Sequence, residues 1–278
     1  MLVARGERHE RLQHDGLIVN SQAYHIPVVH PDRASAPADL ILVAVKGYQL
    51  PEAAGDLRNL VGEHTTLLSV MNGLDSEEIL AGFYGADKVL YAMSLGIDAV
   101  REGNRVTYTK PGTHYFGRAT NTQPGERVRR VQEAFARAGI AYETPADMIR
   151  TLWWKFMINV GVNLPSAVIG ARYGVFQTSP DMQALMEDLM REVIAVANVA
   201  GVDLAEGDVV DWYPILQTLS PEGKTSMLQD IEAGRRTEVE TFAGKVVELG
   251  QAYGIPTPVN RTMLHLIRAL EEYPPTQP

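Results

Sequence analysis

Three polar residues, Lys155, Asn159 and Asn163, recur at intervals of four within an apolar stretch that runs from Leu152 to Leu164. In an α-helix, residues four apart advance one turn and drift only about 40° around the axis, so these side chains would form one polar line. A helix that is apolar on its other faces is usually buried, and a buried ammonium group is costly to keep. The spacing therefore predicts a site that uses the line.

A lysine in such a place has a lowered pKa and can deliver a proton near neutral pH. The alternative is that Lys155 lies at a helix edge and extends its ammonium group to water. Asn159 and Asn163 favour the functional interpretation, because they continue the polar line along the helix.

Two more polar residues follow predicted strands. Lys46 comes after the apolar run 39–45, and Asn72 comes after the run 66–70. Ligands of open α/β sheets bind outside the carboxyl ends of the strands, so both residues are placed to meet one. Each also has an ordinary explanation, because Asn-Gly is a common turn signal and Lys46 could be a solvated loop cation.

Two polar residues of the C-terminal half have weaker signals. Glu238 flanks an apolar helical face over 239–249, and Ser226 begins the segment 226–230. An exposed acid in the first turn of a helix would explain Glu238 equally well, since the helix dipole favours it there. Ser226 by itself indicates nothing.

The elements that must position these residues differ between the two parts of the chain. Short apolar runs alternate with helical patterns in the first part, which is typical of an open α/β sheet with parallel strands. The predicted strands are 39–45, 66–70, 88–93 and 141–143, the predicted helices are 51–61, 76–83 and 126–138, and 105–108 with 114–116 predict an appended hairpin.

Beyond about residue 145 the strand signal disappears. Helices are predicted at 146–163, 180–200, 221–233, 235–253 and 259–272. The chain is therefore expected to be of the α/β class, with an α/β domain over 1–145 and an all-helical domain over 146–278.

Composition excludes several classes of function. The 278 residues carry a net charge of −9, which argues against a general nucleic-acid binder or a protein held to membranes by basic residues. No window approaches 18 consecutive apolar residues, so we expect no membrane span. The chain has no cysteine, which removes thiol catalysis and thiolate metal sites and fits a cytoplasmic protein. We expect no metal site.

Taken together, in this order, these segments resemble the ketopantoate reductase (2-dehydropantoate 2-reductase) family, NADPH-dependent enzymes of pantothenate and coenzyme A biosynthesis. The resemblance covers essentially the whole chain. Its most specific parts are the Lys155-x3-Asn159-x3-Asn163 helix and the segment from Ser226 to Glu238. It implies a Rossmann-type NADP-binding domain over 1–145 and a helical substrate and dimerisation domain over 146–278. A homodimer is therefore one of the expected oligomeric states.

The resemblance implies roles for the polar residues on a small 2-oxo acid substrate. Lys155 would be the general acid that protonates the ketone oxygen, and Glu238 would hydrogen-bond the substrate. Asn159, Asn163 and Ser226 would bind its carboxylate and hydroxyl ends.

Three residues would serve the NADP cofactor by the same resemblance. Asn72 would lie between nicotinamide and substrate and contact both, and Lys46 would lie near the cofactor. Arg5 matches the residue that would grip the 2′-phosphate bidentately, although it is also compatible with an ordinary surface arginine.

The largest departure from the family is the absence of a G-x-G-x-x-G turn. The chain begins Met1-Leu2-Val3-Ala4-Arg5-Gly6, which looks like the family's second strand. We therefore expect an incomplete Rossmann-type domain, truncated at its N-terminus because the recorded start is an internal methionine. The alternative is a non-catalytic remnant that binds a small acid or a partner.

Two smaller departures concern the substrate. The family often has asparagine where this chain has Tyr173 and Gly223. Both positions would touch substrate, so a related dehydrogenase that acts on another 2-hydroxy acid is a third hypothesis.

Overall fold

The computed structural model of the protein describes residues 1–273, which fall into two compact units. Unit 1 comprises residues 1–71 and 75–148, and unit 2 comprises residues 72–74 and the chain from 149 onward. The short segment Asn72–Leu74 therefore belongs to a different unit from the residues on either side of it.

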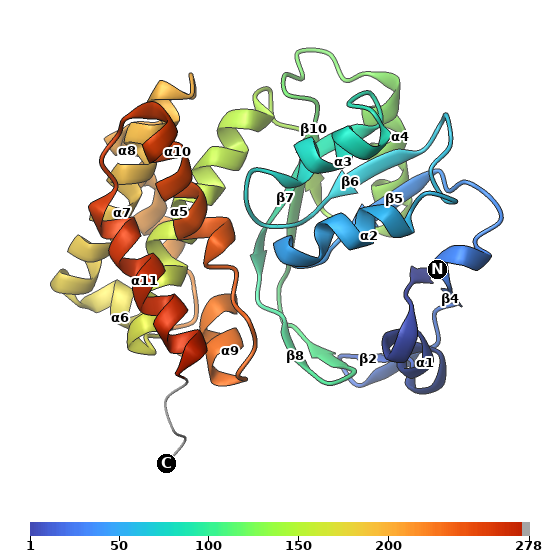
Figure 1. Ribbon diagram of the computed structural model, residues 1–278, viewed down its shortest axis with the longest axis horizontal. Helices are drawn as coiled ribbons and strands as arrows, with labels where there is room; N and C mark the ends of the chain where they lie inside the picture. The colour runs from blue at the N-terminus through green and yellow to red at the C-terminus, as the bar shows by residue number, and fades with distance from the viewer. Residues whose placement is uncertain (274–278) are drawn as a thin grey trace. The chain divides into compact units, whose positions relative to one another are not determined.

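Unit 1 is built on a five-stranded sheet in the order β11-β10-β7-β6-β5 (Figure 1). Its strands are β5 (Leu40–Val43), β6 (Thr66–Ser69), β7 (Val89–Ile97), β10 (Pro111–Gly117) and β11 (Tyr142–Glu143). Strands β5, β6 and β7 pair in parallel, whereas β10 is antiparallel to β7. The predicted α/β class with a parallel sheet is confirmed.

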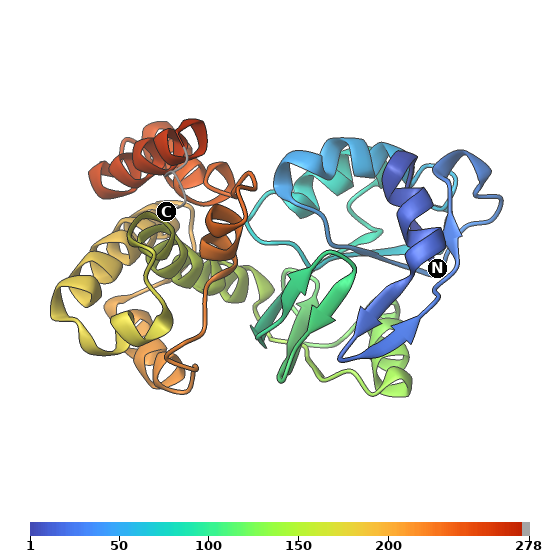
Figure 2. The same cartoon turned by 90° about the horizontal axis from the view of Figure 1, so that it is seen from below.

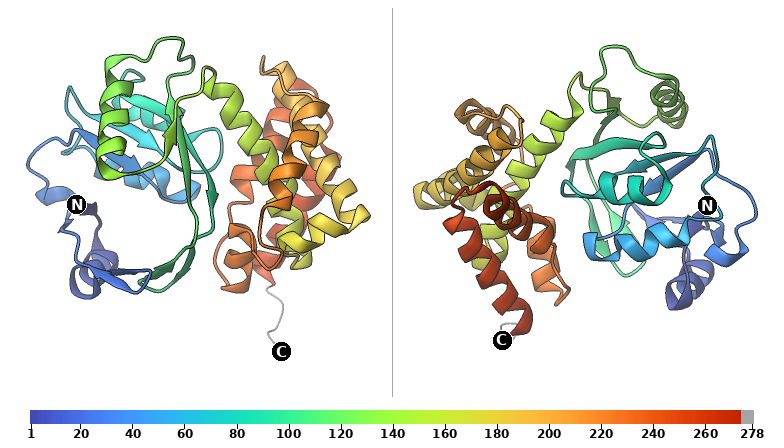
Figure 3. Two further views of the ribbon diagram at one scale, coloured as in Figure 1. Left: turned by 180° about the vertical axis from the view of Figure 1, so that it is seen from behind. Right: turned by 45° about the horizontal axis from the view of Figure 1, so that its top comes forward.

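Helices cover both faces of this sheet. Leu67 of β6 packs in a core with α2 (Leu50–Asp56) and α3 (Ser76–Tyr84). The next residue, Leu68, points to the opposite face and packs with α4 (Glu126–Ala138), seen in green in front of the sheet in the left view of Figure 3. Burial on both faces explains why the strand sequence is continuously apolar.

The parallel strands of unit 1 do not all belong to one sheet. Strand β1 (Leu2–Val3) pairs in parallel with β4 (Val28–Val29), and the two form a separate sheet. The connecting helix α1 (Gly6–Asp15), dark blue in Figure 2, contacts β4. Strand β5 ends the larger sheet, and its Leu42 is 51% exposed although it lies in a strand.

The predicted hairpin between 105–108 and 114–116 is wrong. Strand β9 (Arg105–Thr107) pairs instead with β8 (Val100–Glu102), across a tight turn in which Gly103 has φ +62°. These strands join β2 (Leu17–Val19) and β3 (Gln22–Tyr24) in a four-stranded sheet. Strand β10 returns to β7, a register that local patterns do not encode.

Unit 2 is all-helical in its described residues (Figure 1). Its elements are α5 (Met148–Ile169), α6 (Tyr173–Thr178), α7 (Pro180–Val199), α8 (Glu206–Gln217), α9 (Ser226–Glu232), the π-helical turn η3 (Glu240–Gly244), α10 (Lys245–Tyr253) and α11 (Pro258–Glu272). The core of the unit is assembled around α5. Helix α7 approaches α5 closely at Gly161, where an added Cβ would lie 2.6 Å from Met190 Cγ.

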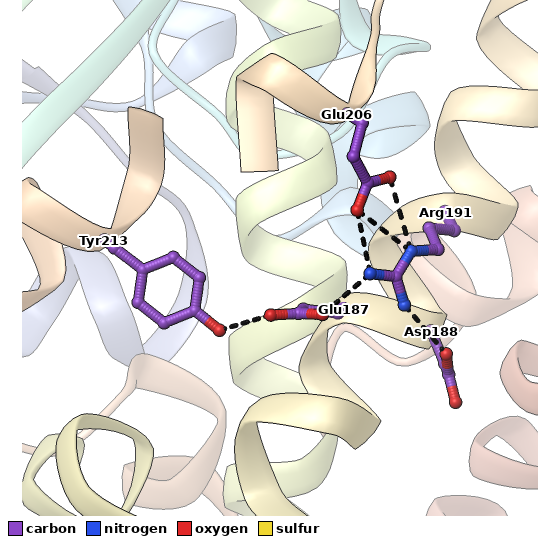
Figure 4. A network of polar contacts seen from close by, with 5 residues as sticks. All are labelled: Glu187, Asp188, Arg191, Glu206 and Tyr213. Atoms are coloured by element: carbon purple, nitrogen blue, oxygen red, sulfur yellow. Dashed lines mark hydrogen bonds and ion pairs between the residues drawn. The ribbon is translucent and has the colours of Figure 1, made fainter. Parts of the chain in front are cut away.

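A polar network joins α7 to α8 (Figure 4). Arg191 contacts both oxygens of Glu206, at 2.8 to 3.3 Å, and also pairs with Glu187 and Asp188 of its own helix. Tyr213 of α8 donates to the other oxygen of Glu187 at 2.5 Å. Every ionised group in it has a partner, so the network is structural.

Candidate functional site

The three polar residues of the apolar stretch lie on one helix, α5, as predicted. Asn159 and Asn163 are each only 7% exposed, and Lys155 keeps a small part of its side chain accessible. The residues between them, such as Phe156 and Val160, are buried in the core of unit 2. The polar line is therefore carried by a helix that is packed on most of its circumference.

Lys155 is the residue of this line with the most unusual environment. Burial lowers the pKa of its ammonium group to about 8, because desolvation disfavours the charged form. The group makes no hydrogen bond or ion pair within residues 1–273. Within the same residues, only Trp212 and Asn260 have a side-chain polar atom that is fully buried and lacks a partner. The ammonium group of Lys155 has no partner and is not one of these atoms, so it is still accessible to solvent.

Asn72 connects α5 to Glu238 by two hydrogen bonds. The amide of Asn159 donates to Asn72 Oδ1 at 3.3 Å, and the amide of Asn72 donates to Glu238 Oε2 at 3.2 Å. The interpretation of Asn72 as a simple turn residue is therefore incomplete, because its side chain links two other residues of the predicted set.

The backbone around Asn72 is held by a close contact at Gly73. This glycine has φ +97°, and an added Cβ would lie 2.5 Å from Thr241 Cγ2 in η3. Both the left-handed backbone and the lack of space require glycine. The π-helical turn η3 begins directly after Val239, and such turns often occur at functional sites.

Glu238 is buried, with 5% of its surface exposed, which excludes the alternative of an exposed acid. The preceding residue fixes its position, because Thr237 donates from its N–H and its hydroxyl to Glu271 Oε1, at 2.7 and 2.6 Å. Glu271 was not singled out from the sequence, since an acid near the end of a helix has no local signal that reveals its partner.

Ser226 is the first residue of α9 and is exposed. Its neighbour Thr225 caps α9 by accepting from Leu228 N at 3.1 Å, and donates to Ser166 of α5 at 2.9 Å. Ser166 follows Asn163 by three residues, so Ser226 begins a helix that is anchored close to that end of the polar line. The predicted start of this helix at 221 is wrong, because residues 220–223 form a turn instead.

The two predicted cofactor residues outside this group lie in unit 1. Arg5 lies two residues after the end of β1 and pairs with Asp56 through two nitrogens, one of them at 3.0 Å. This carboxylate raises the pKa of Arg5, so the guanidinium stays charged. Lys46 precedes the short 3-10 helix η2 (Gly47–Gln49), and its N–H donates to Gln49 at 3.1 Å.

The sequence around Arg5 bears on how a dinucleotide diphosphate could be held. The turn from β1 to α1 contains one glycine, Gly6, with φ +54°, and no G-x-G-x-x-G turn for the diphosphate.

Two other features, a membrane-crossing helix and a cluster of metal-ligating side chains, are absent from residues 1–273. None of the helices there is long and apolar enough to cross a membrane. Over the same range, no three histidine, aspartate or glutamate side chains converge as ligands for a metal ion.

Comparison with known proteins agrees with the sequence resemblance. Residues 1–121 match the family model described as "Ketopantoate reductase PanE/ApbA", and residues 147–271 match "Ketopantoate reductase PanE/ApbA C terminal". A 2-dehydropantoate 2-reductase of Halobacterium salinarum is 31% identical over 273 residues, which cover 96% of this chain and 89% of the relative.

Solved structures show the same fold. A PanE/ApbA family ketopantoate reductase from Ralstonia eutropha has a TM-score of 0.83 and 27% identity, and the match covers 97% of this chain and 90% of that one. A D-mandelate dehydrogenase solved with NADH and anilino(oxo)acetate has a TM-score of 0.88 over 98% of this chain and 90% of its own, with 18% identity. The chain belongs to the ketopantoate reductase family of oxidoreductases.

Proposed function

We propose that this protein reduces ketopantoate, or a 2-oxo acid close to it, to the 2-hydroxy acid with NADPH. The observation that carries the proposal is the ammonium group of Lys155, which is largely buried, has no partner within residues 1–273 and has a pKa lowered to about 8. The relative from Halobacterium salinarum, a 2-dehydropantoate 2-reductase, supports the choice of substrate.

Lys155 supplies the proton of the reaction in this proposal. When bound, the reduced nicotinamide supplies a hydride to the ketone carbon. The ketone oxygen then gains negative charge, and Lys155 stabilises it and transfers a proton to it, which leaves a neutral amine that regains its proton from solvent. A pKa near 8 suits this role, because the group is mostly protonated at neutral pH and yet gives up its proton readily.

Glu238 and Asn72 hold the reacting end of the substrate. Glu238 accepts a hydrogen bond from the hydroxyl group being formed, which fixes the orientation of the substrate. Asn72 keeps Glu238 in place through its 3.2 Å hydrogen bond and is itself oriented by Asn159. Asn163 and Ser226 bind the remaining carboxylate and hydroxyl groups of the acid.

The cofactor is bound mainly by unit 1 in this proposal. Arg5 binds the 2′-phosphate that distinguishes NADPH from NADH, in competition with its present partner Asp56. Lys46 adds positive charge near the cofactor phosphates, and Asn72 contacts the nicotinamide.

The test is NADPH oxidation with ketopantoate, measured for the wild type and for Lys155→Ala. We expect kcat to fall about 10²- to 10⁴-fold in the variant, as for other missing general acids. The wild-type rate should decrease as pH rises through about 8, where Lys155 loses its proton. Lys88→Ala is the matched control, because Lys88 is a partly buried lysine of unit 1 that pairs with Asp87. An unchanged rate in Lys155→Ala would overturn the mechanism.

Direct binding separates this proposal from the non-catalytic alternative. Calorimetric titration with NADPH should show binding that weakens in Arg5→Gln. A protein that binds the 2-oxo acid but has no affinity for NADPH would support the alternative of a remnant that only binds a small acid.

A further inference from the structure

We propose that Glu271 and Arg268 of α11 are positioning residues, which hold Glu238 in place by binding the chain on either side of it. The inference rests on the proposed function, in which Glu238 contacts the substrate. It adds that the reaction depends on two charged side chains that act through Glu238 and not on the substrate itself.

Glu271 binds the residue before Glu238. Thr237 is only 3% exposed, and its N–H and its hydroxyl both donate to the same carboxylate oxygen, Glu271 Oε1, at 2.7 and 2.6 Å. The hydroxyl oxygen of Thr237 also accepts from Val239 N at 3.2 Å, a local bond typical of threonine at a turn. One oxygen of Glu271 therefore anchors a short turn that has Glu238 at its centre.

Arg268 binds the residue that follows this turn. Its Nε and one terminal nitrogen donate to the two oxygens of Glu240, at 2.7 and 2.8 Å. This hydrogen bonding lowers the pKa of Glu240 and raises that of Arg268. Both side chains are about half exposed, so the pair contributes little to stability. Its two parallel bonds instead fix a direction, that in which η3 begins.

The two anchors come from one face of α11. Arg268 and Glu271 are three residues apart, so their side chains are neighbours on the helix surface. Ile267, beside Arg268, is fully buried in the core of unit 2. At the other end of α11, Glu192 of α7 accepts from two main-chain N–H groups of the first turn, at 2.8 and 2.9 Å. The helix that provides the anchors is therefore itself held firmly.

The chain around Glu238 has little regular structure of its own. Residues 233–236, which precede the turn, are exposed throughout, and the turn continues into the π-helical η3. Such helices are rare and occur mostly as single turns. Since no regular α-helix carries Glu238, its contacts with α11 determine where its main chain lies.

A small displacement of Glu238 would affect the reaction. Its carboxylate accepts from Asn72 at 3.2 Å, which is near the upper limit for a good hydrogen bond. A working site holds its groups to within about 0.5 Å, and a displacement of about 1 Å can lower a rate roughly 100-fold. Loosening either anchor is therefore expected to reduce kcat although neither anchor reaches the substrate.

The test is a double-mutant cycle on kcat for NADPH oxidation with ketopantoate. Glu271→Ala should lower kcat about 20-fold and leave the KM for NADPH unchanged. Glu271→Gln should stay within about twofold of the wild type, because the amide oxygen can still accept both bonds from Thr237. In a Glu238→Ala background, Glu271→Ala should have no further effect, since the group that it positions is gone. Glu272→Ala, at the exposed neighbouring acid, is the matched control.

The same cycle with Arg268→Ala gives an independent answer. Its effect on kcat should be smaller, about fivefold, because the pair with Glu240 is exposed, and it should also vanish in the Glu238→Ala background. The exposed pair is not required for folding, so this variant serves even where Glu271→Ala does not fold. Thermal unfolding should show the same loss of stability for Glu271→Ala in both backgrounds, which separates stability from positioning.

The remaining outcomes contradict one proposal or the other. If Glu271→Ala and Arg268→Ala lower kcat by the same factors in both backgrounds, or lower stability alone, the anchors only stabilise unit 2 and the inference is overturned. An equal loss of kcat in Glu271→Gln and Glu271→Ala also overturns it. If Glu238→Ala keeps the wild-type kcat, or the wild type does not oxidise NADPH with ketopantoate, the proposed function itself fails.

Discussion

Each unit of the molecule contains an ionisable side chain whose pKa is strongly shifted by burial, Glu77 in unit 1 and Lys155 in unit 2, and their hydrogen bonding differs. Glu77 in α3 of unit 1 is 4% exposed and accepts hydrogen bonds from Ser76 Oγ at 2.8 Å and from Ala92 N at 3.4 Å. Lys155 in unit 2 has no such partner in the described chain. Burial moves both groups toward their neutral forms, raising the pKa of Glu77 to about 7 and lowering that of Lys155 to about 8.

The difference between them supports the proposed catalytic role of Lys155 and a structural role for Glu77. Glu77 ties the start of α3 to strand β7 and, with Ser76 and Ser69, completes a network of neutral donors and acceptors. Its perturbed pKa is therefore a consequence of structural packing. Lys155 has a pKa perturbed to a similar extent but keeps its hydrogen-bonding capacity unused and accessible, which is the condition of a group that acts on a ligand.

The largest expected effect is that of Lys155→Met. Activity should fall about 10²- to 10⁴-fold, while the free energy of unfolding at pH 7 should rise by about 2 kcal/mol, because a buried charge is replaced by an apolar side chain. The folded pKa of Lys155 lies below its unfolded value, so the unfolded state binds more protons between about pH 8 and 10.5. Wild-type stability should therefore rise with pH in that window, and the variant should lack this rise. Denaturant unfolding at several pH values measures the stability at pH 7 and its rise with pH. A variant less stable than the wild type at pH 7 would contradict the interpretation of Lys155 as a buried group without a partner.

For Glu77→Gln we expect the opposite result, because the carboxyl group of Glu77 makes the wild type less stable as pH rises. The folded pKa of Glu77 lies above its unfolded value, so its contribution to stability is present below about pH 4.5 and is lost as pH rises through about 7. We expect the variant to be about 2 kcal/mol more stable than the wild type at pH 8, with kcat unchanged within about twofold. A large loss of kcat would show that the buried acid of unit 1 is also functional.

Arg5→Gln tests the cofactor-binding role of unit 1. The KM for NADPH should rise about 10-fold, because one charge-assisted contact to phosphate is lost, and the KM for NADH should stay the same. Arg11→Gln is the control, since Arg11 is an exposed arginine of the neighbouring helix α1. Equal changes for the two cofactors would exclude a role at the 2′-phosphate.

The smallest expected effect is that of Thr237→Val. The substitution removes the 2.6 Å hydrogen bond from the Thr237 hydroxyl to Glu271 and keeps the one from the N–H. The free energy of unfolding should fall by about 1 kcal/mol, and kcat should fall about fivefold because Glu238 is held less firmly. Thr262→Val, at an exposed threonine of α11, should leave kcat unchanged.

Local sequence patterns predicted helices and strands best where apolar residues recur at a regular spacing. Helix α4 has the predicted bounds, 126–138, and the buried strands β5 and β6 lie within the predicted runs. Helix α8 was missed, and it contains Pro214, a residue that usually ends a helix. Helix α6 was also missed, since its six residues are too few to show a helical period.

The sequence by itself determined the α/β class, the helical second part and the polar line on α5, because these depend on residues at most a few turns apart. Only the tertiary structure decided which polar groups have partners. Asn72 and Glu238 are 166 residues apart and lie 3.2 Å from each other at their side chains, and Tyr173 meets Gly223 across 50 residues. Such contacts depend on how distant segments pack, and no local period encodes that.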